Sequence, residues 1–334
     1  MARRALLVGA GAMGRNWAQN LNAHPEVEII GWCDIDLARA EQAIHELGLG
    51  ALPGDNAAKM VAEMLPDFVV DVTVPEAHAS VTIAALDAGI PVLGEKPMAE
   101  SMESARKMVA ASEAGEALYM VSQSRRYHPG LRAFRELVEG LGLGILNVDF
   151  YIGAHFGGFR DEMAYPLLLD MAIHTFDAAR FVSGLDPVSV YAEAFNPEWS
   201  WYAGDACANA MFELTGGVRF NYRGSWCSEG VPTSWESEWR AVGTRGTAKW
   251  DGQHAPVGEW VQPGDGFIRE VSLQTASVDD SIKQHIEGSL AEFLHALDTG
   301  ATPNGECHDN IKSLAMVFAA VESAQTGQRI AISI

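Results

Sequence analysis

Residues 5–14 read Ala-Leu-Leu-Val-Gly-Ala-Gly-Ala-Met-Gly, an apolar run that passes directly into three spaced glycines. The run predicts a short buried strand, and the chain continues after Gly14 with helical periodicity. A G-x-G-x-x-G spacing between a strand and a helix is typical of a turn that binds the pyrophosphate of a dinucleotide. Gly9 would permit the tight turn, Gly11 would let the backbone approach the pyrophosphate, and Gly14 would allow close helix packing. The alternative is a glycine turn without a ligand. We expect the whole loop to bind the cofactor: Gly9, Ala10, Gly11, Ala12, Met13 and Gly14.

A second predicted strand, Val27–Cys33, ends beside Asp34, which follows Gly14 by twenty residues. A carboxylate at this place accepts hydrogen bonds from the ribose hydroxyls of a dinucleotide, and its charge repels the 2′-phosphate of NADP. Asp36 adds negative charge, whereas Arg39, the nearest cation, is expected on the outer face of the next helix. We therefore expect NAD as the cofactor, with NADP less favoured; a mobile Arg39 is the feature that would favour a phosphate.

From residue 5 to about residue 122, short apolar runs alternate with longer stretches of helical periodicity. This alternation is typical of βαβ units, so we predict a parallel sheet in a Rossmann dinucleotide-binding domain over residues 1–122. The expected strands are Ala5–Val8, Val27–Cys33, Phe68–Thr73, Pro91–Gly94 and Leu118–Ser122, and the expected helices are 13–23, 37–47, 57–64, 77–88 and 101–114.

The pattern changes after Ser122, where strand-like segments rich in Trp, Tyr and Thr follow a few helices. We predict a second domain of the α+β class over residues 123–334, with an open and mostly antiparallel sheet. The chain as a whole is then an α/β protein of two domains, in agreement with its length of 334 residues. The main helix of the second domain is expected at Leu167–Val182, and two closing helices near 282–297 and 310–326.

Composition and charge exclude several classes of function. The formal net charge is −21 and the acidic residues are scattered, so neither nucleic acid nor a membrane surface is an expected partner. No apolar run approaches the ~20 residues of a membrane span, and the N-terminal run meets Gly9 too early for a signal peptide. The four cysteines lie far apart, which favours reduced thiols in a cytoplasmic protein over disulfides or a zinc site. We expect no bound metal.

The tripeptide Glu95-Lys96-Pro97 places a lysine where a buried strand should end. Ligands of open α/β sheets bind outside the carboxyl ends of the strands. Lys96 is therefore a candidate active-site residue, and Glu95 a candidate neighbour of the cofactor. The alternative is a solvated lysine in a turn that the proline caps.

The strand that begins at Phe68 ends before a loop that we expect to line the ribose and the nicotinamide. His78 opens the helix after this loop and can contact the cofactor, although a capping or solvated histidine is an equal alternative. The loop comprises Thr73, Val74 and Pro75.

One helix of the second domain carries three ionisable groups in an otherwise apolar segment. Asp170, His174 and Asp177 follow the i, i+4, i+7 spacing that places side chains on one helix face. Oxidation of a secondary alcohol requires a base for the hydroxyl proton, and histidine titrates in a suitable range. We expect His174 to be the general base, Asp170 to orient its imidazole, and Lys96 to stabilise the charge on the reacting oxygen. A histidine that only packs in the core, or a zinc ion held by His174 and Asp170, is the alternative.

At these residues the chain resembles the Gfo/Idh/MocA family of NAD(P)-dependent oxidoreductases over essentially its whole length. The family's strand-ending Glu-Lys-Pro is Glu95-Lys96-Pro97, and its Asp-x-x-x-His motif runs from Asp170 to His174. Ser124-Arg125-Arg126-Tyr127 is similar to the segment after the family's Rossmann domain, and Gly243-Thr244-Arg245-Gly246 is similar to a hairpin of its sheet.

The resemblance implies a Rossmann domain followed by a domain whose open sheet commonly makes dimer or tetramer contacts, so a homo-oligomer is expected. It also implies that Lys96, Asp170 and His174 are the catalytic trio. The substrates of the family are mostly sugars, inositols and related polyols that react at a ring carbinol or ketone, so the resemblance implies a substrate of this class. A redox glycosidase with tightly held NAD and a non-catalytic NAD-binding regulator are the alternatives, and the intact trio argues against the regulator.

The segment before the catalytic helix departs from the family, which often has three glycines where this chain has Ala164-Tyr165-Pro166. This backbone is stiffer and bulkier, so the substrate of a family member does not transfer to this chain. Aromatic and polar side chains on segments that lead into the catalytic helix are expected to contact the substrate. The substrate-binding candidates are Lys96, Arg126, Tyr127, His155, Arg160, Tyr165, Asp170 and His174.

Overall fold

A computed structural model describes residues 2–334, which divide into two compact units. One unit contains the chain up to Ser124 together with Lys283–Leu314, and the other contains Arg125–Ile282 together with Ala315–Ile334. The first boundary lies two residues beyond the predicted one, but the prediction assigned Lys283–Leu314 to the second domain. Among residues 2–334, no helix has the length and apolarity needed to cross a membrane.

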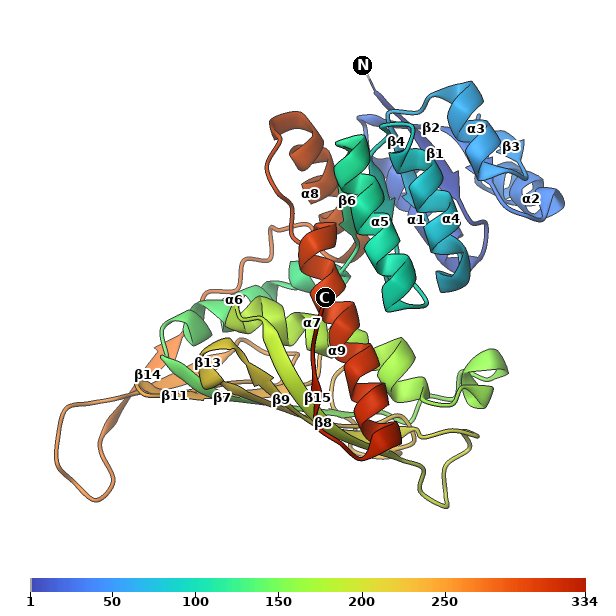
Figure 1. Ribbon diagram of the computed structural model, residues 1–334. Helices are drawn as coiled ribbons and strands as arrows, with labels where there is room; N and C mark the ends of the chain where they lie inside the picture. The colour runs from blue at the N-terminus through green and yellow to red at the C-terminus, as the bar shows by residue number, and fades with distance from the viewer. Residues whose placement is uncertain (1) are drawn as a thin grey trace. The chain divides into compact units, whose positions relative to one another are not determined.

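The first unit is built on a six-stranded parallel sheet with the order β3-β2-β1-β4-β5-β6 (Figure 1). This order confirms the predicted Rossmann fold, because it reverses beside β1, where the dinucleotide site of such sheets lies. The short edge strand β3 was not predicted; it contains a proline and a glycine, and Leu52 is 62% exposed, so it has no apolar pattern. The strands are β1 Arg3–Val8, β2 Val27–Cys33, β3 Leu52–Gly54, β4 Phe68–Asp71, β5 Val92–Gly94 and β6 Tyr119–Val121.

The helices of the first unit begin where the sequence supplies a cap. Asn56 accepts a hydrogen bond from the backbone N–H of Lys59, and Ser101 accepts one from Ser104, so α3 and α5 start directly after them. Helix α4 starts at a proline, which is favoured in a first helical turn. The bounds are α1 Ala12–Ala23, α2 Leu37–Leu47, α3 Ala57–Met64, α4 Pro75–Leu86, α5 Met102–Gly115 and α8 His285–Thr299.

Helix α8 belongs to the first unit because its apolar face packs there. Phe293 is fully buried and its ring lies 5.5 Å from that of Phe68 on β4. The helix also contacts α1. The connection that follows adds a backbone hydrogen bond from Val121 at the end of β6 to the carbonyl of Gly305. Helix α9, Cys307–Thr326, then continues from the first unit into the second.

The second unit is built on a nine-stranded sheet with the order β14-β13-β12-β11-β7-β10-β9-β8-β15. Among the described strand pairs of this second sheet only β7 and β10 run parallel, which confirms the predicted, mostly antiparallel sheet. The strands are β7 Leu143–Tyr151, β8 Pro187–Phe195, β9 Cys207–Leu214, β10 Arg219–Ser225, β11 Glu238–Gly243, β12 Gly246–Trp250, β13 Val257–Val261, β14 Val271–Thr275 and β15 Ile330–Ala331.

Helices α6 (Pro129–Glu139) and α7 (Ala172–Ser183) cover one face of this sheet (Figure 1). Phe176 of α7 makes edge contacts with Phe212, Phe220 and Tyr222, which lie 4.8 to 6.0 Å from it by ring centroids. Along β7 every second side chain is buried, and those between them are partly exposed on the opposite face. That opposite face carries polar and charged side chains and is called the open face below.

The predicted helix 167–182 begins differently from the expectation. Leu167–Met171 form a π-helical turn, in which the N–H of Ala172 donates to the carbonyl of Leu167, five residues back. The α-helix α7 starts only at Ala172. Asp170 therefore stands on a widened turn, and the ideal i, i+4 spacing to His174 does not apply to it.

Candidate functional site

The glycine loop between β1 and α1 has two closed positions and one open position. Gly9 has a φ of +102°, and a Cβ there would lie 2.5 Å from the carbonyl oxygen of Val72. A Cβ on Gly14 would lie 2.0 Å from the carbonyl oxygen of Gly9. A Cβ on Gly11 would meet nothing within 4 Å, so this position borders open space. The loop is thus closely packed against the protein at Gly9 and Gly14 and accessible at Gly11. An accessible Gly11 is compatible with the approach of a pyrophosphate.

The start of α1 adds a site for an anion. Gly11 is its N-cap, offers no side-chain cap, and is followed by a first turn without acidic residues. The exposed Ala12 and Met13 present backbone N–H groups that have no acceptor within the helix, at its positive end. Ala10 is buried, and its N–H donates to Asp34 Oδ2 at 2.8 Å. The open N–H groups of Ala12 and Met13 are compatible with an anion at the start of α1, whereas the N–H of Ala10 is bound to Asp34.

Asp34 lies directly after β2 and next to the glycine loop. It is 7% exposed, and its Oδ1 accepts a hydrogen bond of 3.0 Å from the N–H of Asp36. Arg39 lies closer to it than expected: its half-exposed guanidinium is 3.4 Å from Asp34 and 3.7 Å from Asp36. The Asp34 carboxylate thus lies beside the glycine loop, and Arg39 offsets part of its negative charge.

The loop after β4 is organised by a buried carboxylate. Asp71 is fully buried and accepts hydrogen bonds from the Thr73 hydroxyl at 2.6 Å and from the Thr82 hydroxyl at 3.0 Å. His78 is 1% exposed, and its Nε2 lies 3.0 Å from the carbonyl oxygen of Thr73. It is therefore not the solvated histidine of the alternative interpretation. Val74, by contrast, is 62% exposed at the tip of the loop.

Glu95 connects the end of β5 to helix α1. Its Oε1 accepts a hydrogen bond of 2.7 Å from the indole N–H of Trp17, and its Oε2 accepts one of 3.0 Å from the backbone N–H of Lys96. Burial raises the pKa of the Glu95 carboxyl, while the contacts with Trp17 and Lys96 oppose the rise. Glu95 therefore holds the half-buried Lys96 at the carboxyl end of β5. The role of Trp17 has no signal in the sequence, because the two partners are 78 residues apart.

Asp170 forms an ion pair with Arg160 in the second unit. Arg160 Nε lies 2.6 Å from Asp170 Oδ2, and the two side chains are 32% and 17% exposed. The guanidinium also lies over the rings of Phe156 and Phe159, at 5.0 and 4.8 Å. The structure thus joins a predicted catalytic residue to a predicted substrate-binding residue.

The loop that carries Arg160 is fixed by backbone contacts. The N–H of Ala203 donates to the carbonyl of Asp161 at 2.7 Å, and that of Asp205 donates to the carbonyl of Ala164 at 2.8 Å. Between them, a Cβ on Gly204 would lie 2.2 Å from the carbonyl oxygen of Met163, so only glycine fits this approach. The backbone of Met163 and Ala164 is thus packed closely against a glycine in the facing segment.

The predicted polar stripe is divided in the structure. His174 is half-buried on α7. Asp177 is 1% exposed and accepts two hydrogen bonds from Arg126, from Nε at 2.8 Å and from Nη2 at 2.6 Å. Arg126 is itself 4% exposed. This buried pair favours a structural role for Arg126 over the predicted contact with substrate.

The other predicted substrate residues differ in exposure. The imidazole of His155 is 60% exposed, stacks on Trp201 at 3.7 Å, and its Nε2 lies 2.8 Å from a carboxylate oxygen of Glu229. Tyr165 is half-buried against the core of the second unit. Tyr127 is 3% exposed beneath the guanidinium of a neighbouring arginine. His155 and Arg160 are thus the more accessible polar candidates.

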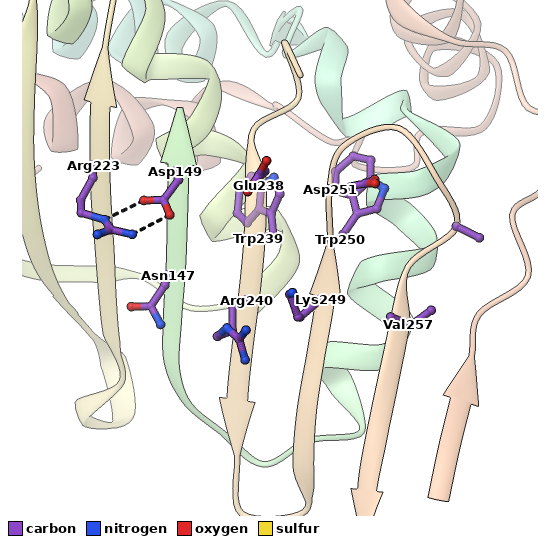
Figure 2. Close-up of a pocket in the computed structure, with 11 residues that line it drawn as sticks. Asn147, Asp149, Arg223, Glu238, Trp239, Arg240, Lys249, Trp250, Asp251 and Val257 are labelled. Atoms are coloured by element: carbon purple, nitrogen blue, oxygen red, sulfur yellow. Dashed lines mark hydrogen bonds and ion pairs between the residues drawn. The ribbon is translucent and has the colours of Figure 1, made fainter. Parts of the chain in front are cut away.

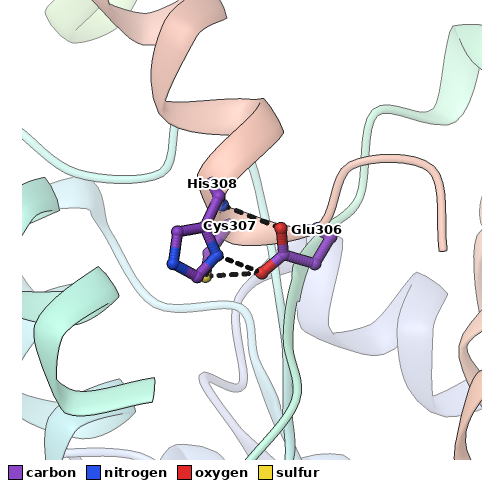
Figure 3. A group of neighbouring side chains, drawn as sticks. All are labelled: Glu306, Cys307 and His308. Atoms are coloured by element: carbon purple, nitrogen blue, oxygen red, sulfur yellow. Dashed lines mark hydrogen bonds and ion pairs between the residues drawn. The ribbon is translucent and has the colours of Figure 1, made fainter. Parts of the chain in front are cut away.

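Among residues 2–334, Glu306, Cys307 and His308 form a group of donors close enough to share a metal ion (Figure 3). Their atoms are occupied by one another: the Cys307 thiol donates to Glu306, and His308 Nδ1 lies 2.7 Å from the same carboxylate. Burial raises the pKa of the Cys307 thiol far above its ordinary value. His308 Nε2 reaches Glu113 on α5 at 3.0 Å. The group is a hydrogen-bonded contact between α9 and α5, and we assign no ion to it.

A pocket of about 490 Å³ lies on the open face of the nine-stranded sheet. Figure 2 shows the paired Arg223 and Asp149 on neighbouring strands, with two cations, Arg240 and Lys249, on the strands beside them. Arg240 and Lys249 are direct cross-strand neighbours. The described lining residues include none of the predicted catalytic or substrate residues.

Comparisons with known proteins agree with the fold and the motifs. Residues 3–123 match the model described as "Oxidoreductase family, NAD-binding Rossmann fold", and residues 157–249 match the model described as "GFO/IDH/MocA C-terminal domain". Together these matches cover more than half of the chain.

Relatives of this chain extend over nearly its whole length. A D-apiose dehydrogenase of Paraburkholderia graminis is 27% identical over 98% of this chain and 89% of its own. An inositol 2-dehydrogenase of an Arthrobacter species is 26% identical over 99% of this chain and 96% of its own. The solved structure of an Agrobacterium radiobacter oxidoreductase in complex with NAD⁺, L-tartaric acid and magnesium has a TM-score of 0.86 and 22% identity, covering 99% of each chain. The structural likeness shows the shared fold.

Proposed function

Because the chain belongs to the Gfo/Idh/MocA family of oxidoreductases, we propose that it transfers hydride between NAD and a ring carbinol or ketone of a sugar, an inositol or a related polyol. Family membership makes the chain an NAD-binding oxidoreductase of the dehydrogenase and reductase type. The names of the D-apiose and inositol dehydrogenases support the substrate class. The observation that carries the proposal in the structure is the glycine loop, which is open at Gly11 and lies beside Asp34.

The residues of the first unit bind the cofactor in this proposal. The N–H groups at the start of α1 hold the pyrophosphate, and Asp34 accepts hydrogen bonds from the ribose. Thr73, the exposed Val74 and Pro75, the first residue of α4, line the nicotinamide side, while the buried His78, together with Glu95, supports these residues from within the unit. When bound, NAD supplies the carbon that accepts or donates the hydride.

Lys96 is proposed to donate a hydrogen bond to the reacting oxygen. A cation near this atom stabilises the negative charge that develops as the hydroxyl proton leaves. Glu95, held by Trp17, fixes the backbone of Lys96, so the ammonium starts from a defined position at the end of β5. A fixed donor is worth more in catalysis than a mobile one, because it does not reorganise during the reaction.

His174 is proposed to take the hydroxyl proton in oxidation and to return it in reduction. Histidine is the side chain whose unperturbed pKa lies near neutral pH, which suits a residue that acts as base in one direction and as acid in the other. Asp170 is proposed to orient this imidazole. The ion pair with Arg160 fixes one oxygen of the Asp170 carboxylate, so we assign Arg160 both a positioning role and a contact with substrate.

A substrate panel tests the proposal. Cyclitols, aldoses and their ketones are assayed with NAD and with NADP, and the absorbance of the reduced nicotinamide is followed. We expect turnover with a polyol or its ketone and a preference for NAD. Absence of turnover with every polyol, together with release of sugar from an aryl glycoside, would contradict the dehydrogenase and favour the redox glycosidase, which shares the hydride step. Tight NAD binding without either activity would favour the regulator.

A homodimer or homotetramer through the open face is part of the proposal. Arg240 and Lys249 are like charges in direct cross-strand register, which destabilises an isolated sheet. Acidic side chains of a second copy would relieve this repulsion, and Glu238 borders the same pocket. We expect wild-type protein to sediment as a dimer or larger and Arg240→Glu to shift it toward the monomer. A monomeric wild type would contradict this interface.

We also propose that the protein functions in a reducing compartment, the cytoplasm. Its four cysteines are free and buried, in agreement with that environment.

A further inference from the structure

Two of the buried cysteines lie side by side in the second unit. Cys207 is the first residue of β9, and Cys227 follows the end of β10 by two residues. Their sulfur atoms are 3.6 Å apart, and the residues are 4% and 1% exposed. The hydroxyl of Ser225 contacts both sulfur atoms, at 3.2 Å from that of Cys207 and 3.6 Å from that of Cys227.

The sheet register brings these thiols together. Cys207 is paired with Ser225, and the N–H of Trp226 donates to the carbonyl of Ala206 at 2.9 Å, so the ladder continues past the end of β10. Cys227 then follows Ser225 by two residues and projects from the same face of the sheet. A disulfide has an S–S distance of about 2.05 Å, which side-chain rotation can reach from neighbouring strands held in this register.

The other two cysteines differ from this pair. Cys33 lies on β2 and Cys307 on α9, in the first unit, and neither contacts another cysteine sulfur among the described residues. They provide internal controls for any reaction that depends on two thiols.

We propose that Cys207 and Cys227 are an oxidation site that a hydroperoxide converts reversibly into a disulfide. The first thiolate attacks the peroxide oxygen, forms a sulfenic acid and releases hydroxide, which takes up a proton as water. The second thiol displaces a second molecule of water from the sulfenic acid as the S–S bond forms. In sum, two thiols and one hydrogen peroxide give one disulfide and two water molecules. A small dithiol returns the pair to the reduced state by exchange.

Burial determines how fast this site reacts. Burial raises the pKa of the Cys207 thiol to about 12, while the Ser225 hydroxyl opposes the rise. The thiolate is the reacting form, so oxidation is slow at neutral pH and becomes faster as the pH rises. A small oxidant reaches the two thiols when the surrounding segments open. A bulky oxidant reaches them less readily.

The cross-link would stiffen the segments that carry two substrate candidates. Cys227 forms a backbone bridge with Gly153, and the N–H of Ala154 donates to the carbonyl of Trp226, directly before His155. On the other side, the segment that precedes Cys207 fixes the loop that follows Arg160, through Asp205. A disulfide would therefore tie together the supports of both loops, whereas the NAD site in the other unit contains neither cysteine.

The experiment treats the full-length protein with hydrogen peroxide at about pH 7.5 and about pH 9, then quenches, denatures and counts free thiols. We expect the count to fall from four to two, with a loss of two hydrogens by intact mass and full recovery with dithiothreitol. Peptide mapping should place the bond between Cys207 and Cys227. Amide hydrogen exchange over residues 152–164 should become slower, and NAD binding by calorimetry should not change.

Matched variants identify the pair. Cys33→Ser/Cys307→Ser should still lose both remaining thiols, whereas Cys207→Ser and Cys227→Ser should each form no disulfide and lose at most one thiol, as a trapped sulfenic acid. Four thiols remaining in oxidised wild type would overturn the proposal. So would a sulfinic acid on either residue with no bond to the other, or a bond that involves Cys33 or Cys307. The thiol count, the intact mass and the peptide map use neither substrate nor NAD, so their outcome is independent of the proposed enzymatic function.

Discussion

Gly11→Ala is expected to separate cofactor binding from folding. The backbone at Gly11 has φ −71° and ψ −172°, which alanine adopts without strain, and its new methyl group would meet no protein atom within 4 Å. We therefore expect the free energy of unfolding of the ligand-free variant to remain within about 0.5 kcal/mol of that of the wild type. The methyl group would instead occupy the space through which the pyrophosphate reaches the N–H groups of α1.

The expected loss of affinity follows from the hydrogen bonds that the methyl group displaces. A hydrogen bond to a charged group contributes about 1.5–3 kcal/mol, so the loss of one such bond weakens NAD binding by roughly 10- to 150-fold. Isothermal calorimetry measures the affinity for NAD, and thermal unfolding without NAD measures the stability of the fold. Gly50→Ala is the matched control, because its Cβ also meets nothing within 4 Å and this exposed residue precedes the edge strand β3 instead of belonging to the glycine loop. NAD binding by Gly11→Ala equal to that of wild type would refute the assigned path of the pyrophosphate.

Three further predictions concern other groups. Lys96→Ala and His174→Ala should each lower kcat by about 10²- to 10⁴-fold with NAD affinity retained; near-normal turnover in either variant would reject its assigned role. Asp177→Asn removes the negative charge that pairs with the buried Arg126 and should destabilise the second unit by about 3 kcal/mol in urea unfolding, whereas an unchanged midpoint would show that the pair is dispensable. Contacts with two carboxylates raise the pKa of His308, so its contribution to stability is complete below the ordinary value of 6.5 and is lost as the pH rises through the raised pKa. Since this side chain is half-exposed, His308→Gln should destabilise by only about 0.5 kcal/mol near pH 5.5 and by nothing near pH 9.5; an equal effect at both pH values would contradict the charge interaction.

The sequence predicted the features that depend on local pattern. The alternation of apolar runs and helices gave the Rossmann sheet, and the bounds of α2 and α3 were correct to the residue. The glycine loop was predicted together with its packing. A backbone with positive φ, as at Gly9, and a close backbone contact, as at Gly14, both require glycine, so the glycines themselves indicate these features. The edge strand β3 was missed because its three residues form no buried face.

Features that depend on distant partners were not predictable in this way. Nothing in the sequence indicates that Trp17 holds Glu95, or that Arg126 pairs with Asp177 instead of facing a ligand. The π-helical turn at Leu167–Met171 was missed for a different reason, since its residues are compatible with an ordinary helix. Helical periodicity then placed Asp170 and His174 on one face by a spacing that the turn alters.

The return of Lys283–Leu314 to the first unit has a consequence for the order in which the chain can fold. During synthesis, the six strands of the parallel sheet emerge long before α8, the helix that packs Phe293 against Phe68. Until then the nascent sheet presents an apolar surface, a state that favours aggregation or chaperone binding. A fragment that ends at Ser124 retains this surface permanently. A stable cofactor-binding fragment should therefore require α8 to be joined to it by an engineered linker.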